Sequence, residues 1–230
     1  MAIYKGNTKI VKLYKGNTQI VKRYKGTDLI YSASRLPSEF QEVEYIESSG
    51  TQYIDTGFLP TINTKIECEW KQTEMPTGTV INYSGMVLSR SAGWCVFGSY
   101  GESNGIASCF CDTVRDGAII SNDTNWHKII TSNGYQQIDN VITNVVSNNF
   151  PSQSNTLQLY LFKGNVNFTG ATFLGKQAFK YCKIYDNNTL VRNFVPCYRK
   201  ADNVAGLYDL VNGVFYTNAG TGTFIVGGNV

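Results

Sequence analysis

Short runs in which hydrophobic and polar residues alternate follow one another along most of the chain, and Gly, Asn, Asp or Ser separates them. In "TKIECEW", residues 64–70, the side chains of Ile66, Cys68 and Trp70 alternate with charged ones. A period of two residues is typical of a strand with one buried face. After residue 38 no segment keeps a helical period of 3.6 residues beyond one or two turns. The pattern predicts an all-β domain of many short strands, either a sandwich or a barrel.

Turn-forming residues mark the expected hairpins. Asn133-Gly134 and Asn212-Gly213 each separate two alternating runs, and Asn-Gly is a strong hairpin signal because both residues accept positive φ. Asp186-Asn187-Asn188 and Ser48-Ser49-Gly50 are expected to form two further turns between paired strands. The apolar run "TLQLYLFKG", residues 156–164, predicts a strand that is buried on both faces.

The first 31 residues have a pattern of their own. "YKGNTKIVKLYKGNTQIVKRYKG", residues 4–26, repeats after ten residues, and its Gly-Asn pairs predict tight turns. We expect a β-ribbon, a meander of three or four strands over residues 3–31. Such a ribbon is marginal in water by itself, so other chains or a docking surface must cover its apolar face. The recurring apolar positions, which we predict to be the oligomerisation surface, are Ile10, Val11, Leu13, Ile20 and Val21.

The chain accordingly divides into three parts. Residues 1–31 are a basic ten-residue β-repeat for attachment and oligomerisation, residues 32–38 are a small polar linker, and residues 39–230 are one domain. A length of 230 residues suits one large all-β domain with an appendage. With 42% hydrophobic residues the chain can form a substantial core, and its 22 Gly against 5 Pro fit frequent turns rather than disorder.

The net charge of +3 conceals an asymmetry. Residues 1–25 hold seven of the 20 Lys and Arg residues and no acidic residue, so the rest of the chain holds 13 basic residues against 17 acidic ones. A basic arm suits nucleic acid, an acidic protein surface or solvent. Arms that bind nucleic acid contact phosphate groups mainly through Arg side chains. The arm at residues 1–25 has a single Arg, and its Lys residues alternate with Ile, Val and Leu. We therefore expect a solvated strand face and no nucleic-acid partner.

Membrane insertion and export are not expected. No stretch approaches 18 consecutive apolar residues, as a membrane-spanning helix would need. The start, Met-Ala-Ile-Tyr-Lys, has no apolar segment of the kind found in signal peptides. We expect synthesis and folding in a cytoplasm.

The six cysteines fit no zinc-binding spacing. Cys109 and Cys111 form a Cys-x-Cys pair, and the chain contains one His. On a strand this pair shares one face and suits a core. Reduced structural thiols are the favoured interpretation, and a disulfide is the alternative.

Two features invite an enzymatic interpretation. The run Glu42-Val-Glu44-Tyr-Ile-Glu47 is similar to the Glu-x-Asp-x-x-Glu strand of glycosidases, in which one carboxylate is the nucleophile and another the acid. Here the middle residue is Glu, the run falls on the first strand of the domain, and Glu47 points away from the other two on a regular strand. His127 lies in the strand-like run "NWHKII", which favours a partly buried structural role. We predict no catalytic residue, and a glycosidase is the enzymatic alternative.

A glycan site combines an aromatic platform with amide or carboxylate groups on loops at one rim. Trp94 and Tyr100 flank Gly-rich loops, while Asn122 and Asp123 lie in a polar loop, and we predict that these four residues bind the ligand. The turn at residues 186–188 is a second polar loop. Ca²⁺ needs six or more oxygens that converge from several loops, which no motif indicates, so we predict no cofactor and no metal site.

Two stretches carry a resemblance to a known fold. "NWHKIITSNGYQQIDNVI" resembles the Trp-His strand and following hairpin of laminin-G-like, concanavalin A-like jelly rolls. "AFKYCKIYDNNTLVRNFVPC" resembles their closing strand. The resemblance implies a two-sheet antiparallel jelly-roll sandwich over residues 39–230, preceded by the β-ribbon.

A more specific resemblance covers both ends of this domain. "LPSEFQEVEYIESSGTQYIDTG", together with "VRNFVPCYRKADNVAGLYDLVNGVFYTNAGTGTF", looks like a class of bacteriophage and prophage virion proteins in which Tyr-Lys-Gly repeats often precede the sandwich. It implies a non-enzymatic tail, fibre or head-fibre protein that displays a lectin-like sandwich to host cell-surface polysaccharide. It also implies a homotrimer that contacts other virion proteins through the repeat. A secreted bacterial lectin or adhesin is the non-viral alternative, and it would need an export signal.

Overall fold

The structure is a computed structural model of the 230-residue chain. It describes residues 4–5, 8–9, 13–20, 22–25, 28–32, 35–75, 97–99, 105–108, 110, 117–146, 157–165 and 175–230. Before residue 35 and at residues 97–99 the structure describes only the pairing of the backbone. In these segments the burial of the side chain is described only at residues 15–17, 20 and 25. All strand pairs among these residues are antiparallel, and they contain no helix, hence none that could span a membrane. The predicted all-β class is confirmed.

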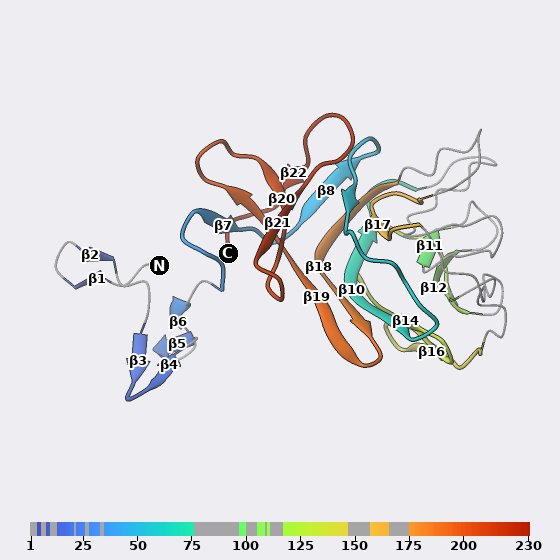
Figure 1. Cartoon of the computed structure of the whole chain (residues 1–230), viewed down its shortest axis with the longest axis horizontal. Helices are drawn as coiled ribbons and strands as arrows, with labels where there is room; N and C mark the ends of the chain where they lie inside the picture. Colours follow the sequence, from blue (N-terminus) through green and yellow to red (C-terminus); the bar gives the residue numbers. More distant parts are fainter. Residues whose placement is uncertain are drawn as a thin grey trace.

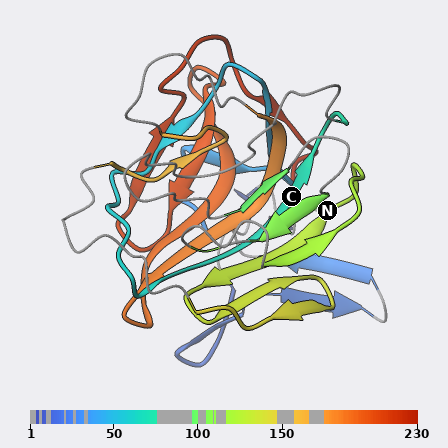
Figure 2. The ribbon, with the colours of Figure 1, turned by 90° about the vertical axis from the view of Figure 1, so that its right-hand side faces the viewer.

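Eleven strands form the main sheet (Figure 1). Along its central path these are β16 Val141–Thr143, β15 Tyr135–Ile138, β14 His127–Ser132, β10 Thr64–Gln72, β18 Lys176–Asp186, β19 Thr189–Arg199, β20 Ala205–Asp209 and β21 Val214–Thr217. Three further strands join at the side: β7 Phe40–Glu42 pairs with β19, and β8 Ile46–Ser49 pairs with β18 and with β22 Ile225–Val226. Figure 2 shows the long strands β18 and β19, in orange, crossing the molecule.

The alternation in the sequence sets the two faces of β10. Every second residue is buried, namely Thr64, Ile66, Cys68, Trp70 and Gln72. The residues between them are half-buried and lie on the other side, which we call the open face of the sheet: Lys65, Glu67, Glu69 and Lys71. The strand predicted from residues 64–70 is therefore confirmed.

Three predicted hairpins are confirmed, each with a turn that contains residues of positive φ. Gly134, with φ of 81°, lies between β14 and β15, and Asn187 and Asn188, with φ of 48° and 63°, join β18 to β19. Gly213, with φ of 68°, closes the hairpin of β20 and β21. Gly and Asn enter this left-handed region at lower cost than other residues, which explains why the turns occur at these positions.

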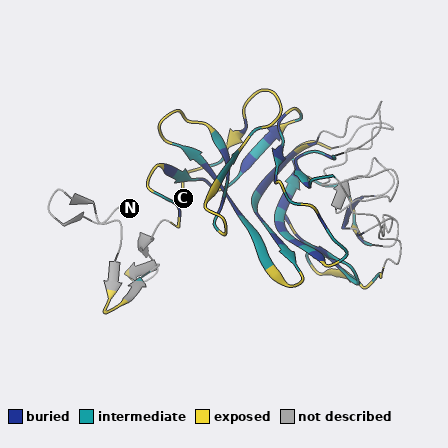
Figure 3. Cartoon of the chain, in the orientation of Figure 1, coloured by how far each residue is buried: buried dark blue, intermediate teal, exposed yellow. Residues whose placement is uncertain are grey.

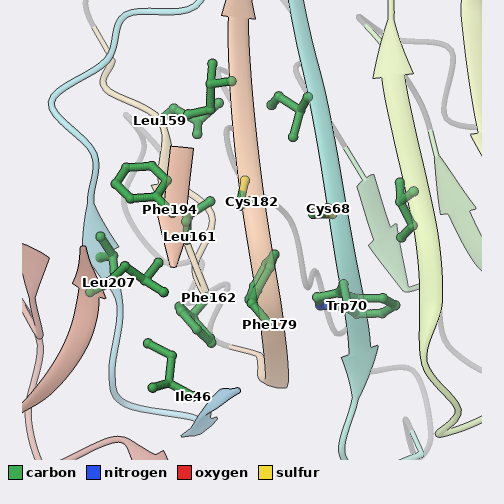
Figure 4. Close-up of a cluster of buried hydrophobic side chains, with 14 of the residues drawn as sticks. Ile46, Cys68, Trp70, Leu159, Leu161, Phe162, Phe179, Cys182, Phe194 and Leu207 are labelled. Atoms are coloured by element: carbon green, nitrogen blue, oxygen red, sulfur yellow. The ribbon is translucent and has the colours of Figure 1, made fainter. Parts of the chain in front are cut away.

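The core lies on the inner face of the main sheet (Figure 4). Trp70 of β10, Phe179 of β18 and Phe194 of β19 are fully buried in it. Phe162 meets Phe179 edge-on, with ring centroids 4.7 Å apart. Buried aromatic side chains each remove about 150–250 Å² from water, so these rings contribute much of the hydrophobic stabilisation. The indole Nε1 of Trp70 donates to Oε1 of Gln177 at 2.9 Å, which satisfies a buried polar atom.

Shorter strands cover this inner face. β11 Phe97–Ser99, β12 Ile106–Ser108 and β13 Ala118–Ile120 form a three-stranded sheet, and β9 Ile54–Asp55 pairs with β17 Tyr160–Leu161. Ile54, Ile106 and Leu161 belong to the same core cluster as the inner residues of the main sheet. Figure 3 shows buried residues concentrated where the two groups of strands face each other.

Two predicted elements are wrong in detail. Ser48-Ser49-Gly50 does not close a hairpin, because β8 pairs with β18 and β22 while β9 pairs with β17. Oε1 of Gln52 accepts from the backbone N of Ser49 at 2.9 Å and bends the chain away from β8. Of the described residues in the apolar run at 156–164, only Tyr160 and Leu161 form a strand, and the φ of 69° at Phe162 ends it.

The two sequence motifs at the ends of the domain lie side by side. β7 pairs with β19, with Glu42 opposite Cys197, and β8 pairs with β22. At this junction Leu36, Phe40, Val195 and Cys197 form a second small core on the other side of β19 from Phe194. Leu36 belongs to the predicted linker at residues 32–38, so that residue packs on the domain.

The ten-residue repeat forms three two-stranded sheets instead of the predicted meander. β1 Tyr4–Lys5 pairs with β2 Thr8–Lys9, β3 Leu13–Lys15 with β4 Thr18–Ile20, and β5 Lys22–Lys25 with β6 Asp28–Ser32. The turn at Gly16, with φ of 62°, returns β3 onto β4 after three residues. Leu13 and Ile20 lie opposite each other in this pair. The other predicted oligomerisation residues, Ile10, Val11 and Val21, lie outside the described residues.

Candidate functional site

A polar cleft of about 390 Å³ lies at one end of the main sheet. Amide side chains from three separate segments line it. The lining residues are Ile62, Asn63, Thr64, Lys65, Ser132, Asn133, Asn187 and Asn188. We call this pocket the amide cleft. Its volume falls in the range of about 300–1,000 Å³ that small-ligand sites occupy.

The register of the main sheet builds this cleft. β10 lies between β14 and β18, with Lys65 opposite Ser132 on one side and Thr64 opposite Asp186 on the other. The turn that carries Asn133 follows directly after Ser132, and the turn that carries Asn187 and Asn188 follows directly after Asp186. Both turns therefore flank the start of β10, where Asn63 lies.

Hydrogen bonds hold the cleft in shape. Nδ2 of Asn63 donates to Oδ1 of Asn187 at 2.7 Å, and Oγ1 of Thr61 donates to Oδ1 of Asp186 at 2.6 Å. These bonds join the segment before β10 to the turn between β18 and β19. Nδ2 of Asn187 also donates to Oδ2 of Asp186 at 3.2 Å, so this amide helps to hold the turn. The exposed amide of Asn188, in the same turn, carries two donors and one acceptor oxygen.

The open face of the sheet continues from the cleft. Nζ of Lys65 lies 4.1 Å from the ring centroid of Tyr185 and 2.9 Å from Oε1 of Glu67. The hydroxyl of Tyr185 donates to Oε2 of Glu67 at 3.2 Å. Burial, and after it the nearby Glu67, raises the pKa of Tyr185, so its hydroxyl remains a donor at neutral pH. Burial, followed by the nearby Cys68, also raises the pKa of Tyr181, to about 12.

Of the four residues predicted to bind glycan, the structure places two. Asn122 and Asp123 lie in the loop before β14, at the opposite end of that strand from the amide cleft. Trp94 and Tyr100 lie outside the described residues. Oδ1 of Asp123 accepts from the backbone N of Asn125 at 2.8 Å, and Oδ2 accepts from its Nδ2 at 2.9 Å. The carboxylate of Asp123 thus helps to hold its own loop.

His127 joins this loop to the next turn. Its Nε2 lies 2.7 Å from Oδ1 of Asp123, and its Nδ1 lies 2.7 Å from Oδ2 of Asp139. Burial acts to lower the pKa of His127, but the hydrogen bonds with Asp139 and Asp123 outweigh it and raise the pKa. Both ring nitrogens are engaged by carboxylates, so neither is left to activate a nucleophile. The predicted position of His127 in a strand is confirmed, and its side chain is buried rather than partly buried.

Glu42, Glu44 and Glu47 do not share a strand. Glu42 ends β7 and pairs with Arg35 at 2.6 Å, Glu47 lies in β8, and Glu44 is exposed between them. The interpretation that all three lie on the first strand is wrong, because β7 and β8 pair with different neighbours. Within the described ranges, no group of three or more His, Cys, Asp or Glu side chains is placed to hold a metal ion.

Sequence reasoning identified part of the cleft as a polar turn and missed the rest. Asn187 and Asn188 stood out as a polar loop, whereas Asn63 and Asn133 had no signal beyond an Asn near a turn. Only the position of β10 between β14 and β18 brings these amides together.

No family model, curated protein or solved structure matches the chain.

Proposed function

We propose that the chain is a non-enzymatic surface protein of a bacteriophage virion, of tail-fibre or head-fibre type, which attaches to host cell-surface polysaccharide. Its domain at residues 39–230 would be a jelly-roll sandwich of the concanavalin A and laminin-G kind. The amide cleft is the observation that carries the proposal. It is a concave rim pocket, lined by convergent polar groups and placed next to an aromatic side chain, Tyr185.

The cleft has the hydrogen-bonding groups that a sugar needs. A sugar hydroxyl both donates and accepts, and so does a side-chain amide. Asn133, Asn187 and Asn188 provide three amides from two turns. None of the eight lining residues is acidic. The lining therefore suits recognition of hydroxyl groups better than acid–base chemistry.

The basic hairpins at residues 1–31 would attach the protein to other virion proteins and join three chains into a homotrimer. A two-stranded hairpin is marginal in water, so it gains stability when another chain covers it. The apolar pair Leu13 and Ile20, on the opposed strands β3 and β4, would supply part of the covered surface.

The test of the cleft uses the positive φ of its two turn residues. Replacement of both Asn187 and Asn188 by Gly removes two amides and retains the turn, because Gly accepts positive φ. Asn203→Gly is the matched control, since Asn203 has a φ of 58° and is exposed in the turn between β19 and β20. Full-length protein is titrated with capsular and wall polysaccharides of candidate bacterial hosts. The double variant should bind at least about tenfold more weakly, a loss of about 1.4 kcal/mol. Unchanged binding would exclude the cleft as the attachment site.

Hydrolysis of the same polysaccharide is the competing function. Glu67 and Glu69 favour it, because both carboxylates lie on the open face of β10, which continues from the cleft. Each is already paired with a lysine, Glu67 with Lys65 at 2.9 Å and Glu69 with Lys180 at 2.5 Å. We expect no release of oligosaccharide on prolonged incubation. Release that disappears in Glu67→Gln or Glu69→Gln would establish a glycosidase instead.

A further inference from the structure

A β-bulge in β18 adds a basic residue to the open face. Glu69 of β10 pairs with Tyr181, and the next residue, Trp70, pairs with Phe179, so Lys180 is the extra residue between the two pairs. A bulge interrupts the strict alternation of sides and re-aims a side chain. Lys180 and Tyr181 are both half-buried, although they are consecutive. The bulge thus keeps the ammonium of Lys180 out of the core.

Two aromatic rings meet beside this lysine. Trp126 directly precedes β14 and Tyr45 directly precedes β8, and β10 and β18 lie between those two strands. The ring centroids of Trp126 and Tyr45 are nevertheless only 5.5 Å apart. The two side chains therefore extend toward each other over the open face.

The ammonium groups of two lysines contact these rings. Nζ of Lys180 lies 4.5 Å from the ring centroid of Trp126. Nζ of Lys71 lies 5.1 Å from the same centroid and 5.6 Å from that of Tyr45. These separations are those of cation–π contacts. We call the group of Tyr45, Lys71, Trp126 and Lys180 the lysine–aromatic cluster.

The cluster has a net positive charge. Lys180 is paired with Glu69 at 2.5 Å. No carboxylate of the described residues pairs with Lys71. An aromatic ring orients an ammonium group but does not neutralise it. Among the described residues, the ammonium of Lys71 therefore has no carboxylate in contact and is held between two rings.

We propose that the lysine–aromatic cluster binds the carboxylate-bearing units of an acidic polysaccharide, an inference that rests on the proposed attachment to glycan. The ammonium of Lys71 would pair with the sugar carboxylate, and the ring surface of Trp126 and Tyr45 that the ammonium groups leave open would contact the apolar C–H groups of the sugar ring. Lys71 and Lys65 lie on the same face of β10, six residues apart, a distance of about 20 Å along an extended strand. One extended saccharide chain would then reach from the amide cleft to the cluster.

The test compares charged and neutral ligands of the same linkage. Full-length protein is titrated calorimetrically with oligosaccharides that contain glucuronate or galacturonate and with their carboxyl-reduced counterparts. The wild-type protein should prefer the acidic form, and the preference should fall as salt is added. Lys71→Met retains the apolar stem and should lower affinity for the acidic form about tenfold, a loss of about 1.4 kcal/mol, with little effect on the neutral form. Lys71→Arg should restore the preference, and Lys200→Met, at an exposed lysine in the turn after β19, should change nothing.

Each outcome separates this inference from the proposed function. If the wild-type protein binds acidic and neutral forms equally, or if Lys71→Met matches wild type, the cluster is not an acidic-sugar site, while attachment through the cleft stands. If Lys71→Met weakens both forms equally, its effect is on the fold, and the inference is also wrong. If the double variant of Asn187 and Asn188 binds normally but Lys71→Met does not, the inference stands and the cleft assignment fails. Absence of binding by the wild-type protein overturns both.

Discussion

Cys68 of β10 lies directly opposite Cys182 of β18, and both thiols are free and fully buried (Figure 4). Burial raises the pKa of both groups well above the ordinary value. A third described cysteine, Cys197, is also free and buried, and burial raises its pKa to about 12. The thiolate is the reactive form of cysteine, so all three thiols are chemically quiet in the folded protein. Reduced structural thiols, as expected from the sequence, are confirmed for these three residues.

The first prediction concerns the reactivity of these thiols. At about pH 8, iodoacetamide should leave Cys68, Cys182 and Cys197 unmodified in the native protein. These thiols stay protonated at that pH, and they are buried away from the reagent. Unfolding in guanidinium chloride should make all three react. Peptide mass spectrometry after alkylation measures each site separately. Modification of Cys182 in the native protein would contradict the buried pair.

The second prediction concerns His127, whose signal is easy to follow because it is the only His of the chain. Its pKa in the folded protein is raised above 6.5, so its contribution to stability is complete below that pH and is lost as pH rises through the folded pKa. Burial acts to raise the pKa of Asp123, but hydrogen bonds from His127 and Asn125 outweigh it and lower the pKa. The contribution of Asp123 to stability is therefore present above pH 3.8 and is lost as pH falls through its folded pKa. The interaction between His127 and Asp123 should therefore stabilise the folded protein most between about pH 3.8 and pH 6.5.

A proton NMR titration should show the histidine pKa above 6.5 in the wild-type protein and lower in Asp139→Asn, which removes one partner charge. Urea unfolding should give a cost for His127→Gln on the order of 1 kcal/mol near pH 6, decreasing as pH rises beyond the folded pKa. The expected loss of stability is small because solvent screens the two carboxylates. In the structure, 37% of the Asp123 side chain and 43% of the Asp139 side chain are exposed. A cost that grew with pH would contradict the assigned interaction.

The third prediction concerns Asp209, a fully buried carboxylate at the end of β20. Its Oδ1 accepts from the backbone N of Asn193 at 2.9 Å and of Val211 at 3.0 Å, and its Oδ2 accepts from Nδ2 of Asn212 at 2.6 Å. Asp209→Ala would leave these donors without their acceptor, at a cost of about 3 kcal/mol in the free energy of unfolding.

Asp202→Ala provides the control for Asp209. Asp202 pairs with Arg199 at 2.6 Å on the surface, and exposed pairs of this kind contribute little. Chemical denaturation should therefore give nearly the wild-type stability for Asp202→Ala. Equal effects of the two substitutions would mean that the buried network does not hold the β20–β21 hairpin.

The fourth prediction concerns the proposed homotrimer. Light scattering of the full-length protein should give about three times the chain mass of 25.6 kDa. Deletion of residues 1–31 should give a monomer whose circular dichroism remains that of a β-protein, because the main sheet and both core clusters are formed by residues from 36 onward. A full-length monomer at micromolar concentration would refute self-assembly and indicate docking on another virion protein instead.

Local signals in the sequence were enough for the class of the fold and for much of its secondary structure. The alternation in residues 64–70 predicts β10, and the Gly and Asn turn residues predict three of the hairpins. These predictions succeed because side-chain alternation and positive φ are properties of a few consecutive residues. Ser48-Ser49-Gly50 has the composition of a turn, yet the side chain of Gln52 redirects the chain, and nothing in the local pattern reveals that bond.

The candidate sites depend on contacts between residues far apart in the sequence. Asn63, Asn133 and Asn187 come together only because β10 inserts between β14 and β18, and Trp126 meets Tyr45 only because those strands share one open face. The sequence by itself determined that the chain would form antiparallel strands, where several of them would turn and where its positive charge would gather. The tertiary structure alone decided strand order, register and the bulge at Lys180, since these are set by which distant strands bury one another's apolar faces.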